Sequence, residues 1–243
     1  MFLHIKKFVA RCLALFNIRL LTLHSHASPK TDSVLLNCFT RNAPLTIFDV
    51  GAHWGESAKH YKQLFKNSNI YSFEPFSEAY NELSKLKIPN FYPLNFGRSD
   101  ENRNETFNIN IGTATNSLLD LDENARKLWG DREILTPKSK VNCEFRTLDS
   151  FCLENDIEFI DFLKIDVQGA EYRVLKGANG MLTKKAIKAI QVEVFFGDSY
   201  KGQKPIEYYI PLIQSYGYKL KMLCDFQIIN NDLLQADLFF VLD

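Results

Sequence analysis

The sequence predicts an α/β protein with a doubly wound, mostly parallel sheet and an antiparallel edge. Short apolar runs alternate with helix-like segments along most of the 243 residues, which is typical of parallel strands joined by helices. The last two apolar runs, 218–224 and 236–242, have no helical pattern between them and therefore predict an antiparallel pair. A chain of this length can bury one core. We expect one domain over 41–243, preceded by a helical lead-in over 1–40.

The expected elements follow in a regular order. A strand is expected at 90–96, and Pro93 favours the sheet edge for it, because proline cannot donate to a ladder. Residues 97–100 are predicted to be a turn. Residues 112–140 are polar and irregular apart from a short helical pattern at 123–129, so this segment is either a lid over a site or disordered. The other expected strands are 45–50, 69–73, 105–111, 141–146, 160–165 and 187–196, and the expected helices are 55–65, 77–86, 148–154, 170–176 and 205–216.

The stretch from Thr46 to Glu74 predicts a nucleotide-cofactor site. An apolar run ends in a turn with Gly51 and Gly55, a helix follows, and Glu74 closes the second run, where a carboxylate can accept hydrogen bonds from both ribose hydroxyls. NAD is disfavoured, because its pattern requires glycine at 53 and 56 and an acid in the first turn repels pyrophosphate. S-adenosylmethionine has no phosphate and carries two positive centres, which suits Asp49 and Glu74. The alternative is a turn that only connects a strand to a helix.

The amino-acid composition gives predictions about the binding partners and the cellular compartment of the protein. The net charge is zero, which gives no support for a nucleic-acid partner. The five cysteines are scattered, odd in number and without a CxxC pair, which predicts a reduced, cytoplasmic protein without a structural zinc site.

Residues 1–30 contain basic side chains and no acid, and their apolar residues fall at helical spacing. Arginines interrupt the apolar run, so it predicts neither a membrane span nor a signal peptide. One interpretation is that residues 1–21 lie on an anionic membrane, which would place the protein peripherally at the inner membrane face. The other is a helix packed on the domain or on a second subunit of a homo-oligomer.

Three motifs carry a resemblance to a known family. Asp-Val-Gly-Ala-x-x-Gly at 49–55, Phe-Glu-Pro at 73–75 and Lys-Ile-Asp-Val-Gln-Gly-Ala-Glu at 164–171 together resemble FkbM-type methyltransferases. The resemblance implies the seven-strand, Rossmann-like class I fold, S-adenosylmethionine as cofactor, and methyl transfer to a hydroxyl of a saccharide or secondary metabolite. The family usually has Asn where this chain has His53. The cofactor-binding residues so expected are Asp49, Gly51, Ala52, His53, Gly55, Glu74, Pro75 and Ser117.

The chemistry of methyl transfer directs attention to buried charged residues. An alcohol is a poor nucleophile at neutral pH, so a base or a divalent metal should take its proton; the sequence indicates no metal. Asp166 ends a central strand, where α/β sheets place their active crevice, and is expected to be the base or an orienting acceptor; the alternative is an acid that closes the turn. Lys164 and Glu193 interrupt buried runs on adjacent strands and are expected to meet, as a catalytic or substrate-binding pair or as a structural ion pair.

Two further residues are expected to contact the acceptor. Glu171 either binds a polar substrate or caps its helix, and Tyr200 forms either a wall of the acceptor pocket or part of the core. The preferred function is therefore O-methylation of a small-molecule or glycan acceptor. The alternatives are a catalytically idle module that binds a partner through its basic N-terminal helix and, disfavoured by His53 and Glu56, an NAD-dependent sugar enzyme.

Overall fold

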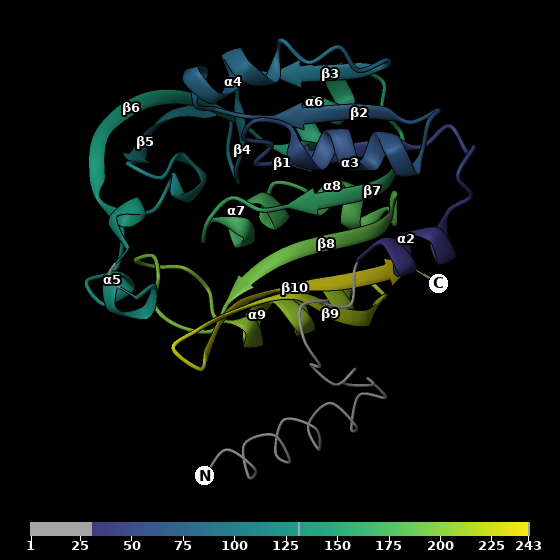
Figure 1. Ribbon diagram of the computed structural model, residues 1–243. Coiled ribbons are helices and arrows are strands. Elements are labelled where there is room, and N and C mark those ends of the chain that lie inside the picture. The colour runs from purple at the N-terminus through teal and green to yellow at the C-terminus, as the bar shows by residue number, and fades with distance from the viewer. Residues whose placement is uncertain (1–30, 131, 243) are drawn as a thin grey trace, which may run out of the picture.

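The computed structural model describes residues 31–130 and 132–242. A seven-stranded sheet crosses the molecule in the order β3-β2-β1-β7-β8-β10-β9 (Figure 1). The first five strands in that order are parallel, and β10 runs antiparallel to both β8 and β9. This arrangement confirms the predicted sheet, with Pro93 on an edge strand. The strands are β1 (Thr46–Val50), β2 (Asn69–Phe73), β3 (Phe91–Leu94), β7 (Ile160–Ile165), β8 (Ile187–Phe195), β9 (Tyr218–Ile229) and β10 (Asp232–Leu242).

Helices cover both faces of this sheet, because successive strand residues point to opposite sides. On β1, Ile47 packs in one apolar cluster with α2 and α3, whereas Phe48 packs in another with α6, α7, α8 and α9. Leu35 of α2 is fully buried, so the described part of the expected lead-in joins the core. The helices are α2 (Thr31–Cys38), α3 (Glu56–Leu64), α6 (Leu148–Glu154), α7 (Glu171–Lys176), α8 (Asn179–Thr183) and α9 (Ile206–Ser215).

A second sheet of three strands lies beside the first, in the order β4-β6-β5. The strands predicted at 105–111 and 141–146 are present in it as β5 (Arg103–Asn110) and β6 (Pro137–Arg146). The turn predicted at 97–100 is wrong in part, because β4 (Gly97–Arg98) pairs with β6. Two residues are too few for a periodic pattern to reveal a strand. Together with α4 (Ser77–Leu83), this sheet encloses a small apolar cluster around Phe107 and Phe145.

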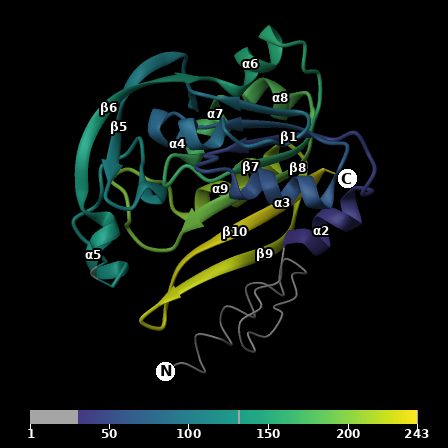
Figure 2. The same ribbon diagram turned by 45° about the horizontal axis from the view of Figure 1, so that its top comes forward.

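The segment 112–140 buries more than its polarity suggests. It contains a single helical turn at Thr113–Thr115, α5 (Ala125–Leu128) and another turn at Glu133–Leu135. Figures 1 and 2 show α5 on the same side of the molecule as the tip of the long β9–β10 hairpin. Its polar, irregular pattern predicted no apolar face, yet this segment and the hairpin share an apolar cluster that includes Ala125, Trp129, Leu135, Ile229 and Leu234.

The predicted amphipathic helix, with its proposed contacts to a membrane or a second subunit, lies outside the described residues. Within residues 31–130 and 132–242, no helix combines the length and the apolar character needed to cross a membrane.

Candidate active site

A cavity of about 530 Å³ lies where β1, β2, β7 and β8 end. The carboxyl ends of parallel strands meet at one edge of a sheet, so residues far apart in the sequence converge there. One half of the cavity is lined by the Gly51–His53 loop, Glu74 and Pro75, and the other by Asp166 and Glu193. The segment 112–140 borders the cavity through residues 113–116, Trp129 and Arg132, as its predicted position over the crevice requires.

The glycine loop is built around backbone contacts that exclude side chains. Gly51 has a φ of 86°, and a Cβ placed on it would lie 1.8 Å from the carbonyl oxygen of Asp166. The amides of Gly51 and Ala52 both donate to the carbonyl of Phe73, each over 3.1 Å. Gly55, at φ 82°, begins α3. The loop therefore passes so close to β2 and β7 that only glycine fits at position 51.

Glu74 is fixed by the same loop. Its Oε2 accepts the amide of His53 at 2.8 Å, and its Oε1 accepts the amide of Phe76 at 3.0 Å. Burial raises the pKa of Glu74 to about 7, against the lowering effect of these two hydrogen bonds. Glu74 is thus held rigidly at the cavity wall.

His53, the departure from the family pattern, links the loop to the covering segment. Its Nε2 lies 2.9 Å from Thr113 Oγ1, and its ring stacks on Trp54 with the ring centroids 4.4 Å apart. Burial lowers the pKa of His53, which favours the neutral imidazole. The side chain of His53 therefore joins two walls of the cavity.

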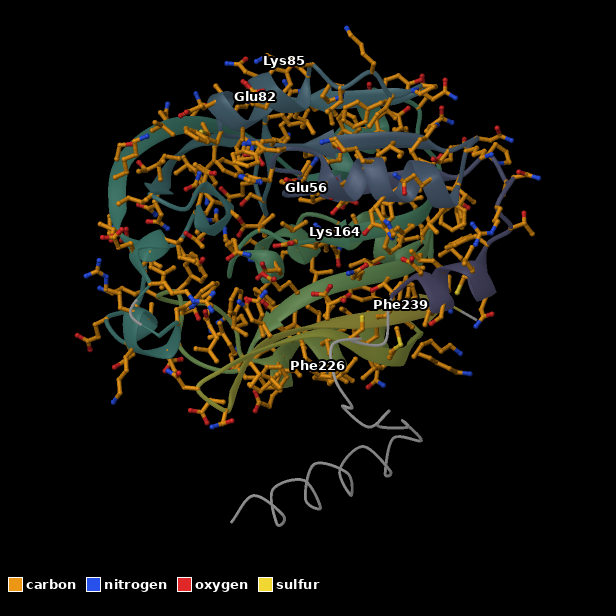
Figure 3. The ribbon with its side chains drawn as sticks, viewed as in Figure 1. Glu56, Glu82, Lys85, Lys164, Phe226 and Phe239 are labelled. Atoms are coloured by element: carbon orange, nitrogen blue, oxygen red, sulfur yellow. The ribbon has the colours of Figure 1, made fainter. Side chains whose placement is uncertain are left out.

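Lys164 lies near the centre of the molecule (Figure 3) between two carboxylates. Its Nζ is 3.2 Å from Asp166 Oδ2 and 3.5 Å from Asp49 Oδ1. Burial alone would lower the pKa of Lys164, but Asp166 and Asp49 raise it well above its usual value. Asp49 is fully buried behind Lys164, so the structure places it under the site and not on the cavity wall.

The expected meeting of Lys164 with Glu193 is wrong, and the strand register explains it. Lys164 lies opposite Gln191 on β8 and opposite Asp49 on β1. Because Ile165 pairs with Val192, Glu193 is level with Asp166, the residue after the end of β7. Glu193 is two residues beyond Gln191, so its side chain is on the same face of the sheet as that of Lys164 but one step further along the strand, and the ammonium pairs with Asp49 and Asp166 instead.

Asp166 faces the cavity, with a third (33%) of its side chain exposed. Its amide donates to the carbonyl of Val50, which ties it to the end of β1. Burial acts to raise the pKa of Asp166, but the ammonium of Lys164 and hydrogen bonds to Gln168 and Glu193 outweigh it, and the pKa lies below its usual value. Asp166 is therefore an ionised acceptor at neutral pH.

Gln168 connects Asp166 with Glu193, and no role in the site was predicted for it from the sequence. Its Nε2 donates to Asp166 Oδ1 at 3.0 Å and to Glu193 Oε2 at 2.8 Å, and its Oε1 accepts the Tyr200 hydroxyl at 2.9 Å. Its φ is 57°, a left-handed conformation that is uncommon outside glycine. A polar residue before Gly169 in the turn after a buried strand was the available signal.

Three expected site residues support the Gln168–Gly169 turn from behind. Ser117 Oγ donates to the carbonyl of Gln168 at 2.6 Å, and Tyr200 donates to its side chain. Glu171 is fully buried, and its Oε1 accepts the amides of Val167 and Gly169, both at 3.0 Å. Glu171 therefore holds the turn that precedes α7, whereas the N-cap residue of that helix, Ala170, has no side-chain cap. All three side chains are buried, and none of them is among the residues that line the cavity.

Glu193 has a different electrostatic environment from Asp166. Its Oε1 accepts Gln235 Nε2 at 2.5 Å. Burial, followed by repulsion from Asp166, raises the pKa of Glu193 well above its usual value. Two neighbouring carboxyl groups thus differ in protonation, with Asp166 ionised and Glu193 able to hold a proton.

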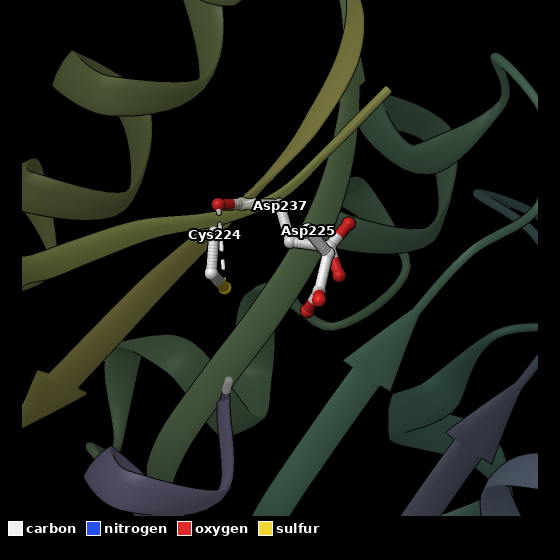
Figure 4. A group of neighbouring side chains, drawn as sticks. All are labelled: Cys224, Asp225 and Asp237. Atoms are coloured by element: carbon white, nitrogen blue, oxygen red, sulfur yellow. Dashed lines mark hydrogen bonds between the residues drawn. The ribbon is translucent and has the colours of Figure 1, made fainter. Parts of the chain in front are cut away.

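Potential metal ligands gather elsewhere in the described residues. Cys224, Asp225 and Asp237, on β9 and β10, place ligand atoms within 4.8 Å of one another (Figure 4). Burial raises the pKa of the Cys224 thiol, which disfavours the thiolate that binds metals. Asp237 also accepts a hydrogen bond from Gln191. This group is separate from the cavity lining.

Comparison with known proteins agrees with this geometry. Residues 49–220 match the family described as "Methyltransferase FkbM domain". The "2-O-methyltransferase NoeI" of Sinorhizobium fredii is 28% identical over 179 residues, which cover 70% of this chain and 71% of that protein.

Two solved structures resemble the chain at low identity. One is an rRNA methylase from Streptococcus thermophilus, at 12% identity and a TM-score of 0.49, covering 89% of this chain and 100% of that chain. The other is Aeropyrum pernix fibrillarin with bound S-adenosyl-L-methionine, at 14% identity and a TM-score of 0.43, covering 85% of this chain and 72% of that chain. Because the family match covers residues 49–220, which is more than half of the chain, the chain belongs to the FkbM-type family of S-adenosylmethionine-dependent methyltransferases.

Proposed function

We propose that the protein methylates a hydroxyl oxygen of a saccharide or a similar polyol-like secondary metabolite. The observation that carries this proposal is Asp166, an ionised carboxylate that opens into the cavity beside the glycine loop. A hydroxyl needs such a base, since its own proton must leave as the oxygen attacks. The relative from Sinorhizobium fredii is named a 2-O-methyltransferase, which supports oxygen as the methylated atom.

The residues of the first half-cavity fit S-adenosylmethionine. Glu74 would accept the ribose hydroxyls, and the close-packed loop from Gly51 to Gly55, with Pro75, would hold the rest of the cofactor. A lining that contains Glu74, Asp166 and Glu193 suits a ligand with two positive centres. Asp49 and Ser117 would act indirectly, through Lys164 and Gln168.

When bound, S-adenosylmethionine would supply the methyl group and would leave as S-adenosylhomocysteine. The chain positions the acceptor and removes its proton. Asp166 Oδ1 or Oδ2 accepts the hydroxyl proton, while Lys164 and Gln168 keep the carboxylate ionised and oriented. Holding the oxygen in line can itself lower the barrier substantially.

The test compares wild-type protein with Asp166→Asn. Cell extract is incubated with isotopically labelled S-adenosylmethionine, and saccharides and small metabolites are searched by mass spectrometry for the added methyl group. We expect Asp166→Asn to keep cofactor affinity within a few-fold and to lower turnover by about 10²–10⁴. Asp156→Asn, at an exposed residue after α6 that is not among those lining the cavity, is the matched control.

Several outcomes would contradict the proposal. Retained activity in Asp166→Asn would reduce Asp166 to a turn-forming residue. A methyl group found only on nitrogen or carbon would exclude O-methylation. Activity lost with EDTA and restored by a divalent ion would make Asp166 a metal ligand, and absence of cofactor binding by calorimetry would favour an idle binding module.

A further inference from the structure

We infer that the β9–β10 hairpin forms the acceptor-selecting wall of the site, through Gln227 and Gln235, and that this wall selects an acceptor with a second hydroxyl next to the methylated one. The inference rests on the proposed function. Both glutamines line the same cavity as Asp166. They are direct partners across the β9–β10 ladder, which places their side chains on one face.

The hairpin lies outside the part of the chain that defines the family. The family match ends at residue 220, whereas Gln227 and Gln235 follow it. The glycine loop, Glu74, Asp166, Gln168 and Glu193 all fall inside the match. Cofactor binding and proton removal therefore come from the shared region, and the opposite wall is supplied by this chain's own hairpin.

The strand pairing of the hairpin is irregular beside Gln235, and apolar packing holds the hairpin tip. The β9–β10 register shifts on both sides of Gln235, between Leu233 and Gln235 and again before Asp237. Such irregularities redirect side chains and are frequent beside active sites. The hairpin tip is held by Ile229 and Leu234, which pack in the apolar cluster that contains Trp129. The wall is therefore fixed relative to the segment that borders the cavity.

The groups on this wall match hydroxyls. A glutamine amide both donates and accepts hydrogen bonds, as a hydroxyl does. Gln235 already holds Glu193, and within the described residues the side chain of Gln227 has no hydrogen-bond partner, so it is available to a ligand. In the part of the chain that the structure describes, Gln235 Oε1 is buried without a hydrogen-bond partner. An aromatic or alkyl acceptor would leave this oxygen and the half-buried amide of Gln227 unpaired, which disfavours its binding.

The distance between the two carboxyl groups indicates neighbouring hydroxyls. Gln168 Nε2 is 3.0 Å from Asp166 Oδ1 and 2.8 Å from Glu193 Oε2, so these oxygens are at most 5.8 Å apart, the sum of 3.0 and 2.8. One hydroxyl at Asp166 and a second on the adjacent carbon, at Glu193 and the hairpin glutamines, can bridge that distance. The acceptor class is a polyhydroxylated ring with a vicinal diol.

The experiment measures acceptor binding without turnover. Wild-type protein saturated with S-adenosylhomocysteine is titrated with neutral methyl pyranosides and with their 3-deoxy analogues, in which no two hydroxyls are on adjacent carbons, and binding is followed by saturation-transfer NMR. We expect a pyranoside to bind and its deoxy analogue to bind at least about threefold more weakly. Gln227→Leu and Gln235→Leu should each weaken pyranoside binding by about three- to tenfold, the range of one or two neutral hydrogen bonds.

The controls separate this inference from the proposed function. Cofactor affinity and the unfolding midpoint should be unchanged in Gln227→Leu, which removes no hydrogen bond from the described part of the fold. Gln214→Leu, on the exposed face of α9, should behave as wild type. Equal pyranoside binding by Gln227→Leu and wild type, or equal binding of diol and deoxy sugars, would overturn the inference and leave the proposed function standing. A wild-type protein that binds cofactor but no pyranoside would contradict the saccharide acceptor, and the inference with it.

Discussion

Lys164 shows how a single residue organises the charges beneath the cavity. An unpaired ammonium at this depth would be strongly destabilising. Asp49 and Asp166 flank it and hold it protonated. In return, Lys164 keeps Asp166 ionised, which a proton acceptor requires. The buried charge that looked anomalous in the strand sequence therefore acts on the base through electrostatics.

Glu74 gives the first prediction at the residue scale. If its carboxylate holds the ribose hydroxyls, Glu74→Ala should weaken S-adenosylmethionine binding by about 1.5–3 kcal/mol, the strength of a charged hydrogen bond. Glu74→Gln keeps one acceptor oxygen and should lose less. Isothermal titration calorimetry measures both, with circular dichroism to verify folding. An unchanged dissociation constant in a folded Glu74→Ala would contradict the assignment.

Gly51 gives the second prediction at the residue scale. Gly51→Ala would place a Cβ 1.8 Å from a backbone oxygen, so we expect it to lower the free energy of unfolding by more than about 3 kcal/mol, beyond the usual effect of a point substitution. Gly202 also has a positive φ, of 80°, but a Cβ there meets nothing within 4 Å. Gly202→Ala should lose only about 1–2 kcal/mol, from backbone strain. Equal losses in urea denaturation would show that the loop can move away from Asp166.

At the scale of elements, the register between β7 and β8 determines which charged side chains pair. We predict that the segment 112–140 controls access to the cavity. The segment 112–140 is anchored by Trp129, whose Nε1 donates to Ser199 Oγ at 3.1 Å, and by the His53–Thr113 contact. The segment is also held by backbone hydrogen bonds from Asp122 to Ser199 and from Lys201 to Asp120, and by the packing of Trp129 in its apolar cluster, so opening it would break all of these contacts together. Closing it would exclude water that competes with the acceptor.

We predict that this segment is mobile in the free protein and ordered when cofactor and acceptor are bound. Trypsin should cut the free protein near Arg126, Lys127 or Arg132, and the ligand pair should suppress these cuts. Cleavage at Lys85, an exposed residue of the loop after α4 (Figure 3), is the internal control. Trp129 fluorescence provides a second readout. Equal cleavage with and without ligands would mean that the segment is a passive insertion.

At the scale of the whole molecule, buried acids set the pH dependence of stability. Burial raises the pKa values of Glu74, Glu171 and Asp237 to about 7. The folded state therefore binds more protons than the unfolded state between the ordinary carboxyl pKa and about 7, so stability decreases as pH rises through this interval. Because the pKa of His53 is lowered, this residue makes stability increase with pH, but it is one group against the three carboxyl groups.

We accordingly predict that the free energy of unfolding of the cofactor-free protein falls between about pH 5 and about pH 7. In Glu171→Gln the slope should be shallower, by up to about 1.4 kcal/mol per pH unit, the contribution of one proton. Urea denaturation at a series of pH values measures both profiles. A flat or rising wild-type profile would show that these carboxyl groups are not buried in their neutral form.

The sequence by itself determined the sheet, the cofactor loop and the place of Asp166. Each of these depends on local signals: apolar runs of strand length, glycines where the backbone must turn tightly, and a carboxylate at a strand end. The same signals located Glu74 across the first βαβ unit, because the chain connection there is short and its geometry is regular.

Only the tertiary structure decided how the site residues pair. Register places Lys164 opposite Asp49 and Gln191 and leaves Glu193, two residues further along β8, to Gln168 and Gln235, an alignment that no local pattern contains. Ser117, Glu171 and Tyr200 lie behind the Gln168 turn because long-range packing buries them there. The hairpin glutamines face the cavity through irregular β9–β10 pairing, and such contacts depend on segments that meet only when the chain has folded.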